Sequence, residues 1–87
     1  MFANIENLEV LKINFNQLKV DYEKDKIDPQ VARIEAQTII RNLLKIKEDK
    51  NLTSEIQNEI ASLLRKTNDL LYTVIDDIEM RNTINNV

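Results

Sequence analysis

The chain lacks Gly, Cys, His and Trp entirely, and it has one Pro among its 87 residues. Without Gly it has no flexible loop in which backbone N–H groups can cradle a phosphate. Without Cys it has neither disulfides nor thiolate metal ligands, and without His it lacks the commonest metal ligand and the easiest general base near neutral pH. These absences argue against catalysis. We predict a protein that is not an enzyme and that takes no cofactor, no metal and no small-molecule substrate.

Long apolar runs are also missing. The longest apolar stretches, around Ile39-Ile40 and Leu70-Leu71, are two or three residues long, far below the roughly 20 that a membrane-spanning helix needs. The first nine residues carry two acidic and no basic side chains, the reverse of a secretory signal. We therefore expect a cytoplasmic protein with no transmembrane segment. Ile, Asn and Lys make up 31 of the 87 residues, a bias that we attribute to AT-rich coding, as in low-GC bacteria and their phages and plasmids.

Charge gives little support to nucleic-acid binding. The chain has 12 basic and 15 acidic side chains, for a net charge of −3. Nucleic-acid binders usually concentrate Lys and Arg on one face. The one loose basic cluster here consists of Arg41, Lys45, Lys47 and Lys50. We rank nucleic acid below protein as a partner and expect this cluster to be a solvated helix surface.

The first segment has the apolar spacing of a helix. Its apolar residues recur at intervals of three and four, which places them on one helix face: Leu8, Leu11, Phe15, Leu18 and Tyr22. Asn4 is the candidate N-cap. The helix must end before Pro29, whose ring pushes the preceding residue out of the α region. We predict a first helix over about residues 4–26.

A second helix begins at Asp28 and Pro29, which have the residue types of an N-cap and a first helical residue. Its core face is Ala32, Ala36, Ile39, Ile40, Leu43 and Ile46. Lys residues near its end suit the negative end of the helix dipole. Asn51 tolerates the left-handed conformation that commonly terminates a helix, so we predict this helix over about residues 29–50.

The third apolar pattern is the longest. It follows Thr53 and Ser54, either of which can cap a helix N-terminus, Ser54 in a capping box with Gln57. Its core face is Ile56, Ile60, Leu63, Leu64, Leu70, Leu71, Val74, Ile75 and Ile78, with Thr67 in the one polar slot. We predict a helix over about residues 54–82, roughly 40 Å long, which overhangs its neighbours.

Together the patterns predict an all-α fold: an antiparallel bundle of three helices (about 4–26, 29–50 and 54–82) with a long third helix. We expect a single helical domain over residues 1–87 whose C-terminal tail frays from about residue 82. Ordering a chain costs about 1.5 kcal/mol per residue in entropy, which leaves a short chain little net stability from its own core. We therefore expect dimerisation to complete the bundle, as a homodimer.

A second apolar row is the feature that a simple three-helix bundle does not explain. Val10, Ile13, Val20 and Ile27 lie roughly opposite the core stripe when residues are turned 100° apart. Such a row is either sandwiched between layers of its own chain, or scattered surface, or a contact with another protein. We predict that these four residues bind a protein partner or mediate self-association through helix one.

Clusters of carboxylates offer weaker candidates for chemistry. Alternating acids over residues 21–28 resemble a calcium loop, but Lys26 and Ala32 stand where the loop needs its Gly and its bidentate Glu. Glu55 and Glu59 lie one turn apart without the His partner of a carboxylate metal site. A third cluster is the densest acidic spot of the last helix: Asp76, Asp77 and Glu79. Its neighbouring side chains point about 100° apart, so we interpret it as a charged recognition surface or a solubilising one.

Two segments stand out as a combination: Tyr22-Glu-Lys-Asp-Lys-Ile-Asp-Pro, followed by an amphipathic helix, and Lys50-Asn-Leu-Thr-Ser-Glu-Ile-Gln-Asn-Glu-Ile-Ala-Ser-Leu-Leu. Together they resemble the small immunity proteins of pediocin-like bacteriocins, the enterocin A immunity type. The similarity covers about residues 18–66. It implies a cytosolic antiparallel four-helix bundle, a helix more than we expect here, that protects a bacteriocin producer by acting on the bacteriocin-occupied sugar-transport receptor. It carries no site residue onto this chain. The alternative is a phage- or plasmid-borne regulator or inhibitor of a host protein or, less favoured, of nucleic acid.

Overall fold

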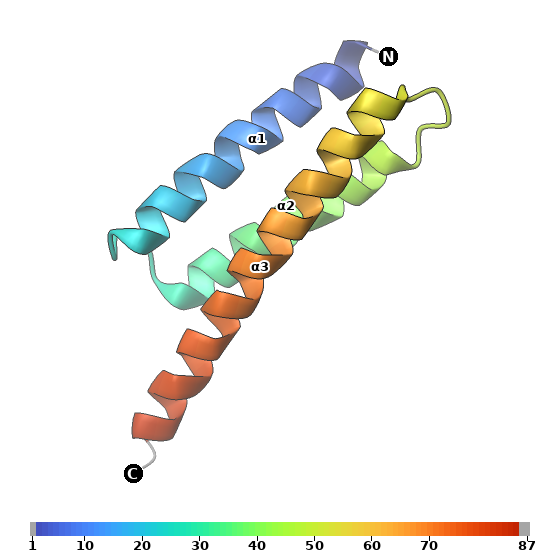
Figure 1. Ribbon diagram of the computed structural model, residues 1–87. Helices are drawn as coiled ribbons and strands as arrows, with labels where there is room; N and C mark the ends of the chain where they lie inside the picture. The colour runs from blue at the N-terminus through green and yellow to red at the C-terminus, as the bar shows by residue number, and fades with distance from the viewer. Residues whose placement is uncertain (1, 86–87) are drawn as a thin grey trace.

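The computed structural model describes residues 2–85 of the chain, and the side chains of residues 6–83. This part consists of three helices and no strand: α1 (Phe2–Glu23), α2 (Pro29–Lys47) and α3 (Ser54–Asn85). Successive helices run antiparallel, and α2 packs against both α1 and α3 (Figure 1). The predicted all-α three-helix bundle with a long third helix is confirmed.

The helix ends differ from their predicted positions. α1 begins before Asn4, which therefore lies inside the helix and is not its N-cap, and it ends three residues early, at Glu23. α2 ends at Lys47, not at 50. α3 continues to Asn85, so the chain is still helical where we expected the tail to fray, and residues 86–87 lie outside the described range.

The end of α1 is fixed by a left-handed residue. Asp25 has φ 57°, and it is the one positive φ in the described part of the chain. The N–H of Asp25 donates to Tyr22 O (3.2 Å) and that of Lys26 to Asp21 O (2.8 Å). This pair of bonds is a Schellman motif, in which the left-handed position usually holds Gly. Asp fills it in a chain that has no Gly, and the predicted left-handed end at Asn51 is wrong.

The starts of α2 and α3 have side-chain caps. Asp28 Oδ1 accepts from the Gln30 N–H (2.8 Å), and Pro29 follows as the first helical residue, as predicted. Thr53 Oγ1 accepts from the Ile56 N–H (3.2 Å). Thr53 is therefore the N-cap of α3, and the alternative capping box that starts at Ser54 is not formed.

The core lies along the inner faces of the three helices. Its buried residues are Leu8, Leu11, Phe15, Leu18, Ala32, Ala36, Ile39, Leu43, Ile46, Ile60, Leu63 and Val74. Thr67 is buried among them, and its hydroxyl donates to Leu63 O (2.7 Å), so its polar atom is satisfied. Ile40 and Ile75 were predicted to be in the core, but both are half-buried and stand outside the core cluster. At 100° per residue, each is turned about 80–100° from the centre of its helix's buried stripe.

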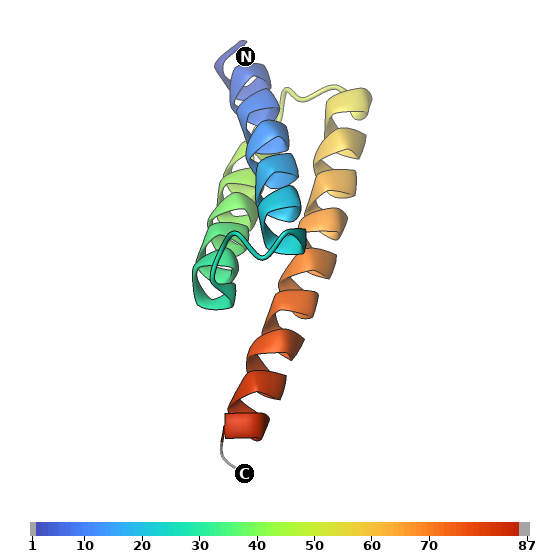
Figure 2. The same cartoon turned by 90° about the vertical axis from the view of Figure 1, so that its left-hand side faces the viewer.

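The third helix extends past the other two. Its C-terminal part runs beyond the connection between α1 and α2 (Figures 1 and 2), and the Cα atoms span 53 × 20 × 15 Å. The Tyr22 hydroxyl at the end of α1 donates to the Asp77 carboxylate and ties α1 to this part of α3. Burial, followed by the hydrogen bond to Asp77, raises the pKa of Tyr22 to about 12.

Candidate protein-binding surface

The outer side of α1 carries the predicted apolar row. Val10 is 52% exposed, Ile13 65% and Val20 41%. At 100° per residue these three side chains fall within about 80° of one another, opposite the buried stripe of the same helix. No helix of the described chain covers them, so the row is not sandwiched within its own chain.

Ile27, the fourth predicted member, does not belong to this surface. It lies in the connection between α1 and α2, is half-buried and packs against the core. The reason is the early end of α1: the left-handed turn at Asp25 redirects the chain before residue 27, which would have joined the row only if the helix had continued.

Polar residues complete the row. Glu6, Gln17 and Lys24 are exposed and continue the helical spacing of the three aliphatic residues. Lys24 follows the last residue of α1, but its N–H still donates to Val20 O (3.1 Å), so it keeps the helical register. We call the set Glu6, Val10, Ile13, Gln17, Val20 and Lys24 the outward row. A search for apolar residues alone misses three of its members, although their spacing is visible in the sequence.

The exposed apolar residues of the other helices are less aligned. α2 exposes Val31, Ile34 and Leu44, which at 100° per residue spread over about 140° of the helix. On α3 the exposed large apolar residues are Tyr72 and Met80. The outward row is therefore the surface on which three aliphatic side chains share one narrow helix face.

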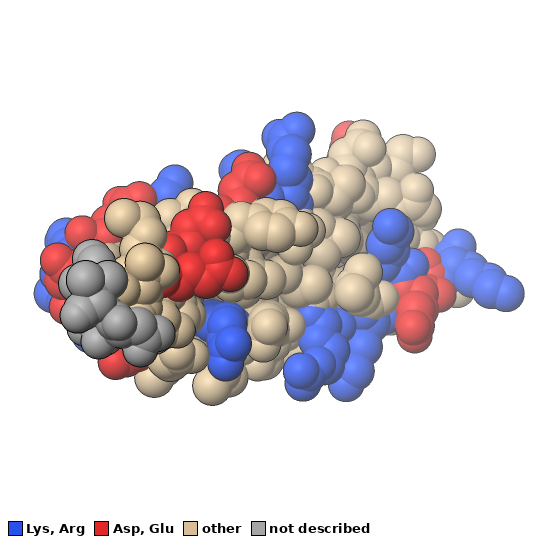
Figure 3. All heavy atoms as spheres, turned by 90° about the horizontal axis from the view of Figure 1, so that it is seen from below, with Lys and Arg blue, Asp and Glu red and all other residues tan. Residues whose placement is uncertain are grey.

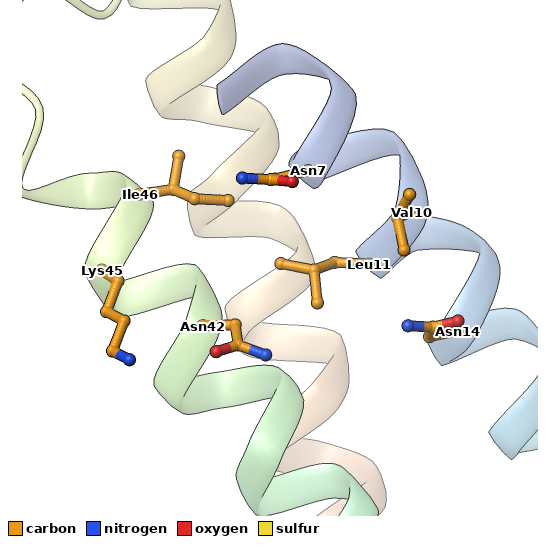
Figure 4. Close-up of a pocket in the computed structure, with 7 residues that line it drawn as sticks. All are labelled: Asn7, Val10, Leu11, Asn14, Asn42, Lys45 and Ile46. Carbon is orange, nitrogen blue, oxygen red and sulfur yellow. The ribbon is translucent and has the colours of Figure 1, made fainter. Parts of the chain in front are cut away.

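Shallow grooves border the row on the side of α2. One, of about 380 Å³, is lined by Asn7, Val10, Leu11, Asn14, Asn42, Lys45 and Ile46 (Figure 4). The amides of Asn14 and Asn42 point into it from the two helices. A second groove shares Asn14 and continues along the same helix pair towards Asp21 and Glu35. Both are open to solvent, and the side chains of Asn7, Asn14 and Asn42 in the first and of Gln17 and Thr38 in the second offer hydrogen-bonding positions beside the row.

On the side of α3, an ion pair ties α1 to the bundle. The Lys12 ammonium lies 3.0 Å from Glu9 Oε1 on its own helix and 3.2 Å from Glu59 Oε1 on α3. The hydrogen bonds to Glu9 and Glu59 raise the pKa of Lys12. Glu59, which the sequence offered as half of a carboxylate pair with Glu55, thus serves as a contact between helices.

The residues of the predicted basic cluster do not share one face, and those of the predicted acidic cluster differ in their surroundings. Arg41 and Lys45 share a side of α2, Lys47 lies about 160° away from Lys45, and Lys50 follows the helix. Both signs of charge are interspersed over the face seen in Figure 3. In the acidic cluster, Asp77 accepts from Tyr22, while Asp76 and Glu79 are exposed.

Two further findings concern the described residues as a whole. They contain no group of three or more Asp, Glu, His or Cys placed to hold a metal ion. None of their helices combines the length and apolar character needed to cross a membrane.

Comparison with protein-family models, with curated proteins and with solved structures finds no match to this chain.

Proposed function

We propose that this chain is a small non-enzymatic interaction protein that binds another helix along the outward row of α1. The observation that supports the proposal is the exposure of Val10, Ile13 and Val20 on one narrow face. Aliphatic side chains at helical spacing are the anchors by which one helix docks on another. Burying such a side chain fully is worth about 1.5–3 kcal/mol, and these three are already partly covered by their own helix, so each gains less than that.

A pair of matched double variants tests the proposal. Ile13→Lys with Val20→Lys places charge on the row, while Val31→Lys with Ile34→Lys makes the same change on α2 at similar exposure, 46% and 56%. Circular dichroism should show unchanged helicity in both, because all four positions are exposed. Self-association, measured by sedimentation, should be lost in the α1 variant and kept in the α2 variant. The same outcome is expected for any cellular activity of the chain. Equal behaviour of the two variants would contradict a docking role for α1.

A more specific proposal is immunity to a pediocin-like bacteriocin, with the chain acting from the cytoplasm on the bacteriocin-occupied receptor. Its support is the resemblance over residues 18–66, which spans the end of α1, all of α2 and the first turns of α3. Expression of the wild-type chain in a strain sensitive to such a bacteriocin should raise survival, and the α1 double variant should not. Survival equal to that of the empty vector would contradict immunity and would leave the helix-binding proposal to the association assay.

The alternative, a phage- or plasmid-borne regulator of a host protein, uses the same surface of α1. Its nucleic-acid version loses support, since the basic residues of α2 do not share one face.

A further inference from the structure

The spacing of the outward row is the same when it is followed from either end. From Glu6 to Lys24 its spacings are 4, 3, 4, 3 and 4, the alternation of a coiled-coil seam. Positions at equal distance from the centre form three pairs, and the residue numbers of each pair add to 30: Glu6 with Lys24, Val10 with Val20, and Ile13 with Gln17. One end is acidic, the middle is mainly aliphatic and the other end is basic. This face is therefore complementary to an inverted copy of itself.

We infer that the partner of the outward row is a second copy of this chain, docked antiparallel through α1 about a twofold axis at the level of Phe15. The inference rests on the proposed function, because it names the occupant of the same face. A twofold contact is isologous, so each of the three pairs forms twice. Glu6 then meets Lys24 of the second copy at both ends, and Val10 packs on Val20 in two layers, with Ile13 and Gln17 between them.

The structure supplies the conditions that this contact needs. Glu6 and Lys24 are exposed, and the bond from the Lys24 N–H to Val20 O keeps Lys24 in line with the row. The axis lies between Asn14 and Asn16, both exposed and uncharged, so no like charges meet at the centre.

Charge selects the direction of the pair. In a parallel pair Glu6 would face Glu6 and Lys24 would face Lys24, which is unfavourable at both ends. In the antiparallel pair the one repulsive meeting is Glu9 with Glu23 at the flank. The Lys12 ammonium, 3.0 Å from Glu9 Oε1, offsets that repulsion.

Charge reversal at the two ends tests the inference. Sedimentation equilibrium up to about 1 mM is needed, because a contact between single helices falls in the small, weak class of interfaces. Glu6→Lys or Lys24→Glu alone turns two attractive pairs into two repulsive ones and should weaken association about tenfold. The double variant restores opposite charges and should return to within about twofold of wild type. The two single variants, when mixed, should associate more tightly than either does alone.

Cross-linking tests the direction independently. Since the chain has no Cys of its own, Val10→Cys and Val20→Cys each introduce a single thiol. In the antiparallel pair residue 10 faces residue 20, whereas two copies of residue 10 are about 15 Å apart along the axis, too far for a disulfide. The mixture should cross-link on oxidation and Val10→Cys alone should not.

Three results would overturn the inference: a wild-type chain that stays monomeric up to about 1 mM, single charge variants that associate like wild type, or Val10→Cys that cross-links to itself. A different outcome is a monomeric wild type together with a loss of protective activity in the Ile13→Lys, Val20→Lys variant. That outcome would exclude a second copy as the partner and would still support the proposed function. If that variant kept both self-association and activity, the inferred dimer and the proposed function would both be wrong.

Discussion

Asp25 offers a direct way to test how α1 ends. At φ 57° the steric cost of a Cβ atom is roughly 1 kcal/mol, a cost absent in Gly, and Asp tolerates this region better than Ala does. We expect Asp25→Gly to raise the free energy of unfolding by about 0.5–1 kcal/mol and Asp25→Ala to lower it. For a domain of this length 1 kcal/mol corresponds to a shift of about 4–8 °C in Tm.

The assay is urea unfolding followed by helical circular dichroism, since the chain has no Trp to serve as a fluorescent probe. Asn51→Gly is the matched control, because Asn51 has no positive φ and gains nothing from the lost Cβ while the unfolded chain gains freedom. Stabilisation by Asn51→Gly together with no stabilisation by Asp25→Gly would contradict a left-handed Asp25. That result would place the left-handed residue at the end of α2.

Three further predictions concern the core, the end of α1 and the start of α3. Leu63→Asp should abolish the cooperative thermal transition, since a buried, unpaired carboxylate costs several kcal/mol, whereas Ile40→Asp at a half-buried position outside the core should still melt cooperatively. Because folding raises the pKa of Tyr22 from about 10 to about 12, its contribution to stability is complete below pH 10 and disappears as the pH rises to 12; Tyr22→Phe should flatten this part of a stability-against-pH curve. Thr53→Ala should cost about 1 kcal/mol in chemical unfolding and Ser54→Ala much less, and the reverse order would show that Ser54 is the cap.

Helical periodicity predicted most of the fold because burial repeats every three or four residues along each helix. It identified all three helices, the cap at Asp28 and the buried Leu and Phe positions of α1. It did not separate Ile40 from Ile39, since neighbouring aliphatic residues look alike in sequence and packing geometry decides which one faces the core.

The site was harder to predict because it depends on where α1 ends. We placed the end of α1 just before Pro29, whereas the left-handed residue Asp25 ends the helix earlier and leaves Ile27 half-buried against the core instead of in the row. Val10, Ile13 and Val20 were found by their spacing. Gln17 was not predicted because apolar residues alone defined the predicted row, although the symmetric spacing of the outward row is present in the sequence.

The overhang of α3 also affects the apparent size of this protein when it is measured in solution. The Cα radius of gyration is 14.8 Å, whereas a compact domain of 87 residues has about 12 Å. By the same scaling, 14.8 Å belongs to a globular chain of about 150 residues. A single copy should therefore tumble anisotropically and leave a gel-filtration column early, close to the position of a globular protein nearly twice its mass.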